Sequence, residues 1–174
     1  MDKEPSVEFK KSILIAEHSP IRDIIVKWLW EGIPHWVGVH WVRHKWEKSV
    51  RTQREDRAGI PRSELSQTEP QNFTGEANIQ HLIDTGRKRR CYLAAPETRE
   101  YMEDLKITIH DEIDKYTADV LVPNCVYRCG CPEQQTCGFF QRLADETDSL
   151  VGSVNIQERY DAYNEWFYRE KKHE

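Results

Sequence analysis

The sequence has no apolar run that approaches the length of a membrane span, and its first five residues form no signal-peptide core. It also has no internal repeats and no low-complexity tracts. Its net charge is −5, whereas general nucleic-acid binding requires positive charge. These absences argue against membrane proteins and against general nucleic-acid-binding proteins, so we expect a soluble, cytoplasmic protein.

The composition nevertheless indicates a folded chain, although the mean hydropathy is only −0.80. Hydrophobic residues make up 38% of the 174 residues and include six Trp, seven Tyr and five Phe. This length is typical of one domain. Residues 40–62 hold seven Lys or Arg against three Asp or Glu. A local positive site in an acidic protein is what a nucleotide-binding enzyme needs.

Hydrophobic periodicity predicts a single α+β domain over residues 1–174. Alternation over residues 24–30 predicts a strand with both faces largely covered. Pro and Gly between residues 56 and 76 predict a loop that serves as a lid. The other expected elements are an extended segment at 6–16, a helix from Pro34, a helix over 76–90, a helix from Pro96, and a final helix with Ile156, Tyr160, Tyr163 and Phe167 on one face.

The expected helix after Pro34 carries a polar stripe. Four of its polar residues recur at the spacing i, i+3, i+4 and i+7, namely His40, Arg43, His44 and Glu47. Trp and Val side chains cover most of the remaining circumference. Because a buried cation is costly unless an anion or a hydrogen-bonding group meets it, the stripe predicts a cavity for a phosphate-bearing ligand. The alternative is a solvated amphipathic helix whose charges face water.

The cysteines predict either a metal site or ordinary thiols. Their number is five, which speaks against a disulfide framework. Four of them lie within thirteen residues, a clustering that can form a structural zinc site: Cys125, Cys129, Cys131 and Cys137. The spacing differs from the paired Cys-x2-Cys of zinc ribbons, so reduced thiols are the alternative.

A motif in the first third of the chain resembles the signature of the flavin-dependent thymidylate synthases. The triplet Arg43-His44-Lys45 stands where that family has Arg-His-Arg, and Arg54 matches the arginine that ends the signature. The triplet also follows Gly32-Ile33-Pro34 at the family's distance. The resemblance covers residues 18–57, and the sequence departs from the family pattern at several points. Lysine replaces the third arginine, Thr52 replaces the family's serine, Arg22-Asp23 replaces an acidic and a histidine position, and the N-terminal portion is short for the family.

A second stretch, residues 123–138 with its cysteine-bearing part 125–138, resembles a form that viral members of this family carry. The resemblance implies a mixed sheet flanked by helices. It also implies transfer of a one-carbon unit from methylenetetrahydrofolate to C5 of dUMP, giving dTMP, with FAD as cofactor and NADPH as reductant. It further implies a homotetramer with sites assembled across subunits.

Residue roles follow from the same resemblance. Arg54 is expected to contact the nucleotide and polarise its base as the catalytic residue. The substrate-binding residues are then His40, Arg43, Thr52, Gln53, Arg54 and Arg128. The flavin-binding residues are Ser19, Arg43, His44 and Lys45.

Two alternatives to dUMP methylation stay open. One is hydroxymethylation of a pyrimidine nucleotide on the same scaffold. The other is a non-catalytic module that is stabilised by zinc and binds a nucleotide or a partner protein. The basic run of residues 87–90 has two readings as well. It stabilises a helix C-terminus, or Arg87 and Arg90 contact a phosphate or a polyglutamyl folate from one helix face.

Overall fold

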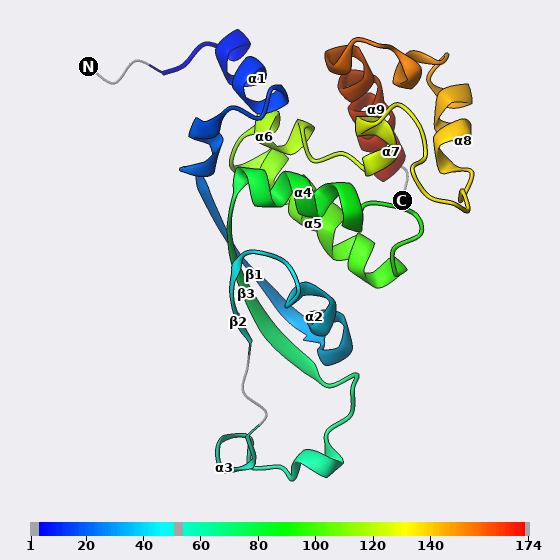
Figure 1. Cartoon of the computed structure of the whole chain (residues 1–174). Coiled ribbons are helices and arrows are strands. Elements are labelled where there is room, and N and C mark those ends of the chain that lie inside the picture. Colours follow the sequence, from blue (N-terminus) through cyan, green and yellow to red (C-terminus); the bar gives the residue numbers. More distant parts are fainter. Residues whose placement is uncertain (1–3, 51–53, 173–174) are drawn as a thin grey trace.

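An antiparallel sheet with the strand order β1-β3-β2 forms the centre of one half of the molecule (Figure 1). The computed structural model describes residues 4–50 and 54–172. The strands are β1 (Ile25–Pro34), β2 (Glu47–Val50) and β3 (Pro70–Asn78). The middle strand, β3, pairs with both neighbours, so segments far apart in the sequence lie side by side.

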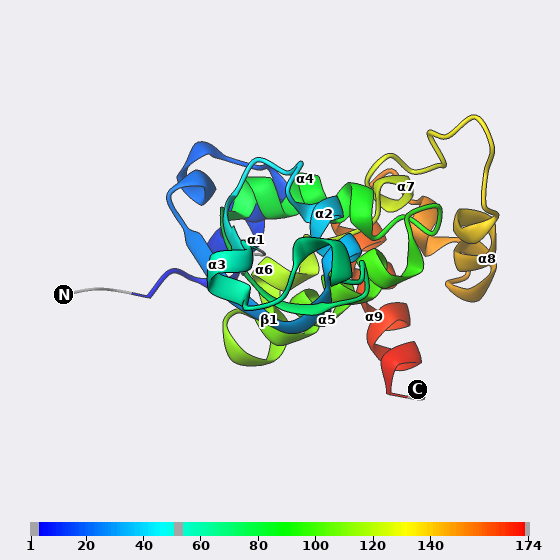
Figure 2. The ribbon, with the colours of Figure 1, turned by 90° about the horizontal axis from the view of Figure 1, so that it is seen from below.

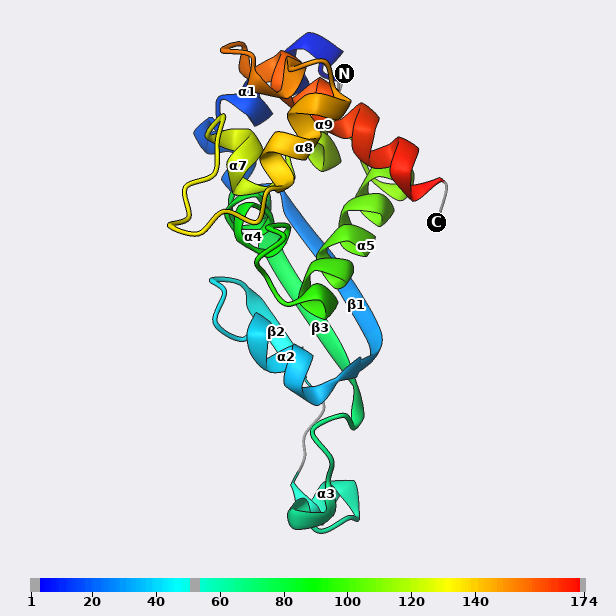
Figure 3. The same ribbon diagram turned by 90° about the vertical axis from the view of Figure 1, so that its right-hand side faces the viewer.

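Helices cover one face of the sheet, and further helices and short 3-10 turns build the other half of the molecule (Figure 1 and Figure 3). In chain order they are α1 (Val7–Ile15), η1 (Ser19–Arg22), α2 (His35–Trp41), α3 (Glu55–Ala58), η2 (Arg62–Glu64), α4 (Ile79–Arg89), α5 (Pro96–Glu112), α6 (Lys115–Asp119), α7 (Asn124–Tyr127), α8 (Phe139–Glu146), η3 (Leu150–Gly152) and α9 (Ile156–Lys171). Within the described ranges, no helix combines the length and the apolar character that crossing a membrane requires.

Aromatic side chains fill the space between the sheet and the helices. Trp30 contacts Trp41, Phe73 and Tyr101, with ring centroids 4.9–5.6 Å apart. Gly75 on β3 allows Trp28 to lie flat against the strand, because a Cβ at Gly75 would lie 2.2 Å from a ring atom of Trp28. This tryptophan packing decides how the chain after β1 folds back onto the sheet.

The helix α4 follows β3 directly and brings its polar face toward residues 43–45. Asn78 is its N-cap, and the Asn78 side chain accepts a hydrogen bond from the His81 backbone amide at 2.9 Å. The opposite side of α4 buries Leu82 and Ile83 in the core. Amphipathic spacing thus fixes which side chains of α4 remain available for a site.

The α+β class is confirmed, and β1, α4, α5 and α9 lie close to where the periodicity predicts them. The final helix buries Tyr160, Tyr163 and Phe167 as expected. The described strands form an antiparallel sheet, however, whereas the family resemblance implied a mixed one.

Three local predictions are wrong. The predicted extended segment at residues 6–16 instead holds α1, and the Ser6 side chain caps this helix by accepting a hydrogen bond from the Phe9 amide at 3.2 Å. The predicted lid over 56–76 includes most of β3, which starts at Pro70 and in which alternate residues such as Gln71 and Phe73 are buried. The predicted coverage of both faces of β1 fails too, since Leu29 is 51% exposed.

The polar helix after Pro34 is also shorter than predicted. It ends at Trp41, the chain turns over residues 42–46, and the next residues form β2. Val39 and Val42 are each 42% exposed, so the expected apolar coverage is incomplete. The chain turns because Trp41 and Trp46 are both buried in the aromatic core, which a continuous helix would not allow.

Candidate functional site

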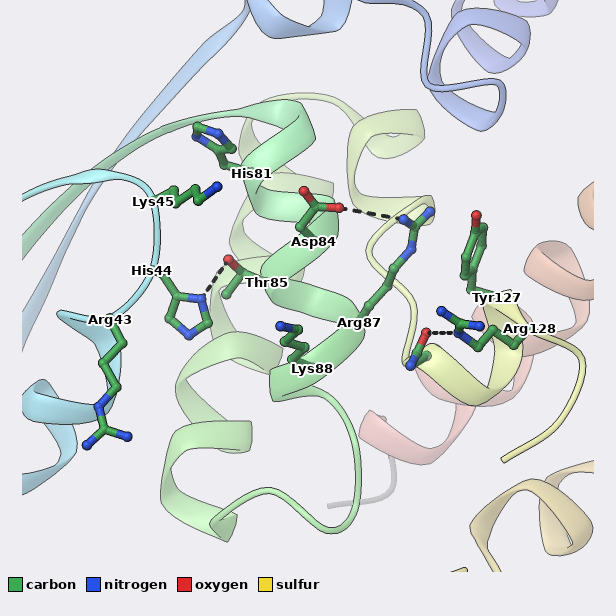
Figure 4. A pocket seen from close by; sticks show the side chains of 11 residues that line it. Arg43, His44, Lys45, His81, Asp84, Thr85, Arg87, Lys88, Tyr127 and Arg128 are labelled. Atoms are coloured by element: carbon green, nitrogen blue, oxygen red, sulfur yellow. Dashed lines mark hydrogen bonds and ion pairs between the residues drawn. The ribbon is translucent and has the colours of Figure 1, made fainter. Parts of the chain in front are cut away.

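A cavity of about 440 Å³ lies between residues 43–45, the helix α4 and the helix α7 (Figure 4). We call it the basic pocket. Its lining includes one carboxylate, Asp84, and five cationic side chains, those of Arg43, Lys45, Arg87, Lys88 and Arg128. In a protein with a net charge of −5, this gathering of positive charge favours an anionic ligand.

The turn after α2 places Arg43, His44 and Lys45 along the lining of the basic pocket. The Trp46 indole nitrogen donates to the Trp41 carbonyl oxygen at 3.1 Å, and the His44 amide donates to the same oxygen at 3.1 Å. With both tryptophans anchored in the core, His44 and Lys45 point toward α4, whereas the Arg43 side chain extends away from that helix at the rim of the pocket (Figure 4). The flanking tryptophans therefore position the triplet.

His44 is held as a neutral imidazole. Burial first, then the charges of Arg89, Lys88 and Lys48, lower its pKa to about 4. Its Nε2 accepts a hydrogen bond from Arg89 Nε at 2.8 Å, so its Nδ1 carries the proton and donates to Thr85 Oγ1 at 3.3 Å. Because both ring nitrogens are engaged, His44 fixes the turn against α4.

Arg87 is the best-compensated cation of the basic pocket. It forms ion pairs with Glu17 and, at 3.6 Å, with Asp84. Its guanidinium carbon lies 3.6 Å from the centre of the Tyr127 ring. Burial opposes ionisation of Glu17, yet the hydrogen bonds from Arg87 and Gln80 lower the pKa of that carboxyl. Arg87 thus ties α4 to α7 and to the segment before η1.

The other four cations of the basic pocket lack the ion pairs that Arg87 forms within the described residues. Arg128 donates from Nε to Asn124 Oδ1 at 3.2 Å, and this neutral partner does not compensate its charge. Arg43, Lys45 and Lys88 make no side-chain hydrogen bond or ion pair with any part of the chain that the structure describes. Unpaired cations around one cavity are well suited to bind a phosphate group.

The structure brings together four of the residues that the sequence predicts for the site: Arg43, His44, Lys45 and Arg128 all line the basic pocket. His40 does not line it, because its Nδ1 is hydrogen-bonded to Thr98 Oγ1 on α5 at 2.8 Å. Ser19 lies exposed in η1. Thr52 and Gln53 lie outside the described residues.

Arg54 lies far from the basic pocket within one chain. It is the N-cap of α3 and pairs with Asp56 at 2.9 Å. The helix α3 projects beyond the end of the sheet, whereas α4 and α7 lie toward the other end (Figure 3). The residues of the predicted nucleotide site are therefore not gathered in a single chain.

Sequence reasoning missed most of the contribution of α4. Four polar residues of this helix recur at i, i+3, i+4 and i+7, and all of them line the basic pocket: His81, Asp84, Thr85 and Lys88. This spacing is the signal that could have identified them. The predicted pairing of Arg87 and Arg90 is wrong, because Arg90 is 1% exposed and faces the core.

A second cavity, of about 400 Å³, adjoins the basic pocket and shares Arg87, Lys88 and Asn124 with it. We call it the thiol cavity. It is lined by Cys91, Cys125, Cys131 and Cys137, of which only the last three belong to the predicted zinc set. Cys129 is exposed and donates from Sγ to the Gly152 carbonyl oxygen at 3.1 Å.

The predicted zinc set is therefore not assembled. Over residues 4–50 and 54–172, no three or more Cys, His, Asp or Glu side chains are gathered closely enough to hold a metal ion. Burial, and then the nearby Cys91 charge, raise the pKa of Cys125 to about 12. Burial also raises the pKa of Cys91. Without a metal, both thiols stay protonated at neutral pH.

The basic pocket and the thiol cavity thus lie side by side and share the C-terminal part of α4. Comparison of the chain with protein-family models finds no match, and comparison with curated proteins finds none either.

Proposed function

We propose that the basic pocket binds the phosphate groups of a nucleotide and that the protein is a flavin-dependent enzyme acting on dUMP. In this proposal it transfers a one-carbon unit from methylenetetrahydrofolate to C5 of dUMP and so forms dTMP. The observation that carries the proposal is that Arg43, Lys45 and Lys88 line one cavity and have no anionic partner among the residues that the structure describes. The resemblance of residues 18–57 to the flavin-dependent thymidylate synthases supplies the reaction.

The donor set suits a phosphate or pyrophosphate group, which FAD and dUMP both provide. Arg43 offers a planar fork for two phosphate oxygens, while Lys45 and Lys88 act as point charges. A bound flavin would supply the reducing equivalents, which NADPH replenishes. His44 has no free nitrogen for proton transfer. We therefore assign it a positioning role.

Arg54 acts in this proposal on the pocket of another copy. Its side chain is exposed on α3, which extends away from the rest of its own chain (Figure 3). In a homotetramer, Arg54 of one chain would reach the basic pocket of another chain and complete the site there. In that position, it would contact the nucleotide base.

The first test measures flavin and nucleotide binding. FAD is titrated calorimetrically into the purified protein, and dUMP is then titrated into the flavin-loaded form. Replacing both Arg43 and Lys45 with Ala should weaken FAD binding at least tenfold, because each charged hydrogen bond contributes about 1.5–3 kcal/mol. The control is Lys27→Ala, since Lys27 lies outside the pocket and pairs with Glu76 at 2.8 Å. Equal affinities in the two variants would refute the assignment of the pocket.

The second test addresses the shared site. Arg54→Lys and Arg128→Ala variants are each expected to have low dTMP-forming activity, whereas mixed oligomers of the two should recover part of it. Recovery is expected because some pockets then contain an intact Arg54 and an intact Arg128. Failure of every mixture, with both parents folded and oligomeric, would contradict a site built from two chains.

A second candidate is a non-catalytic nucleotide-binding module. The separation of Arg54 from the basic pocket within one chain favours it. Such a module would bind dUMP without forming dTMP and would not respond to the mixing of variants. Product analysis after incubation with methylenetetrahydrofolate and NADPH separates the two candidates and also reveals a hydroxymethylated product.

A further inference from the structure

The thiol cavity brings together cysteines from three parts of the chain. Cys91 follows the end of α4, Cys125 lies in α7, and Cys131 and Cys137 lie in the segment between α7 and α8. This segment forms a long loop at the edge of the molecule (Figure 2). The sequence clusters four other cysteines, so Cys91 joins this group only through the fold.

The segment that carries Cys131 and Cys137 has little to hold it in place. Residues 131–137 contain no helix or strand, and residues 132–137 are exposed. Among the hydrogen bonds of the described chain, those of residues 131–137 comprise only a local one, from the Gly138 amide to Thr136 Oγ1 at 3.1 Å. Nevertheless, a thiol at each end of the segment faces the thiol cavity.

We propose that Cys91, Cys125, Cys131 and Cys137 bind one structural zinc ion. Zn²⁺ prefers four thiolates in a tetrahedral arrangement, which leaves no position open for water. The four sulfurs do not yet lie at coordination distance, so the segment of residues 131–137 closes around the ion. This closure breaks no hydrogen bond to the rest of the protein.

The surroundings match the charge of such a centre. Each thiol loses its proton on binding, and four thiolates with one Zn²⁺ carry a net charge of about −2. Arg87, Lys88 and Arg89 line the same cavity and offset this charge. The centre would therefore anchor the C-terminal turn of α4, the turn that also lines the basic pocket.

The decisive comparison is between Cys91 and Cys129. Cys129 belongs to the sequence cluster but is bonded to the Gly152 carbonyl on the exposed surface, and it does not line the thiol cavity. Cys91 lies 34 positions before Cys125 in the sequence but shares the cavity with it. The proposal thus requires Cys91 as a zinc ligand, whereas Cys129 is not a ligand.

The full-length protein is purified under reducing conditions, loaded with Zn²⁺, freed of excess metal and analysed for zinc content and melting temperature. The wild type and Cys129→Ser are expected to hold about one zinc per chain and to melt at lower temperature after treatment with a chelator. Cys91→Ser is expected to lose the zinc. Loading with Co²⁺ should give intense sulfur-to-metal charge-transfer bands in the first two proteins and weaken them in the third.

Cys137→Ser provides a second variant in an exposed segment, in case Cys91→Ser does not fold. It too should lose zinc, with its helix content unchanged by circular dichroism. Retention of zinc by both folded variants, its loss from Cys129→Ser, or its absence from the loaded wild type would each overturn the proposal. The readout is independent of flavin binding and activity, so it does not depend on the proposed function.

Discussion

The cations at the end of α4 divide into two environments, and the contrast between them explains how the site is built. In the basic pocket, Lys88 is exposed and has no anionic partner in the described chain. Two residues later, Arg90 is 1% exposed, donates to the Tyr163 hydroxyl and lies 4.4 Å from the centre of the Phe167 ring. Position on the helix, rather than residue type, decides whether a charge can serve a ligand.

Lys106 shares the buried environment. It is 0% exposed, and its ammonium group donates to the Ala118 carbonyl at 2.5 Å and to Asn164 Oδ1 at 2.8 Å. Both partners are neutral, so burial, with a further contribution from Arg90, lowers the pKa of Lys106 well below its usual value. Buried cations of this kind affect stability, whereas the cations of the basic pocket affect binding.

Truncation of Arg90 should have the largest effect on this contrast. Arg90→Ala leaves a void beside Phe167 and removes the hydrogen bond to Tyr163, which should cost about 3 kcal/mol of unfolding free energy. Arg43→Ala should change the unfolding free energy by less than about 0.5 kcal/mol while weakening FAD binding. Urea denaturation measures the first effect and calorimetry the second. Similar losses of unfolding free energy in both variants would contradict the proposed distinction between buried cations, which affect stability, and pocket cations, which affect binding.

Lys106 should make stability depend on pH. Because its pKa is lower in the folded chain than its usual 10.5, the unfolded chain binds more protons between these two pKa values. The unfolding free energy should therefore rise with pH in this window, by at most about 1.4 kcal/mol per pH unit. Denaturation curves of Lys106→Met should lose this slope, whereas those of Lys27→Met, at an exposed site, should keep it. An unchanged slope in Lys106→Met would show that Lys106 stays charged.

The titration of His44 should also make the unfolding free energy rise with pH, but by less than that of Lys106. Its folded pKa of about 4 lies below the usual 6.5, so its stabilising contribution is complete above pH 6.5 and declines as the pH falls toward 4. The stability difference between the wild type and His44→Gln should shrink across that window. Thermal unfolding of both proteins at several pH values measures it, and parallel profiles would mean that His44 does not titrate as described.

The smallest effect is expected from Lys45→Arg. This change restores a planar fork at an exposed position of the basic pocket, where it can donate two hydrogen bonds to one phosphate group. FAD affinity should improve about twofold to threefold, equivalent to roughly 0.5 kcal/mol. Calorimetry measures the change, and a loss of affinity would indicate that Lys45 contacts the ligand as a compact charge.

Local patterns predicted the long elements well, because each element buries one face through a regular spacing. The helix from Pro96 to Glu112 begins with a proline at its first turn and buries Met102, Leu105 and Ile109, as its periodicity indicates. Residues 42–50 depart from the helix that the spacing predicts, because the helix α2 ends at Trp41 and β2 begins at Glu47. Burial of Trp41 and Trp46 in the same core selects the turn.

The candidate site could be predicted only in part, because local spacing does not show which distant segments pack together. The triplet Arg43-His44-Lys45 and Arg128 could be chosen from the sequence, and they lie in one pocket. His81, Asp84 and Thr85 could not be matched to them, because only the packing of α4 against the turn brings the two sets together.

Composition and short-range spacing are enough to predict the α+β class, the main helices and the concentration of positive charge near residues 40–62. The tertiary structure alone decided which cations face a cavity, that Arg90 and Lys106 are buried, and that Cys91 takes the place of Cys129 in the thiol cavity. These outcomes depend on contacts between residues distant in the sequence, and such contacts form only when the aromatic core fixes how the elements pack.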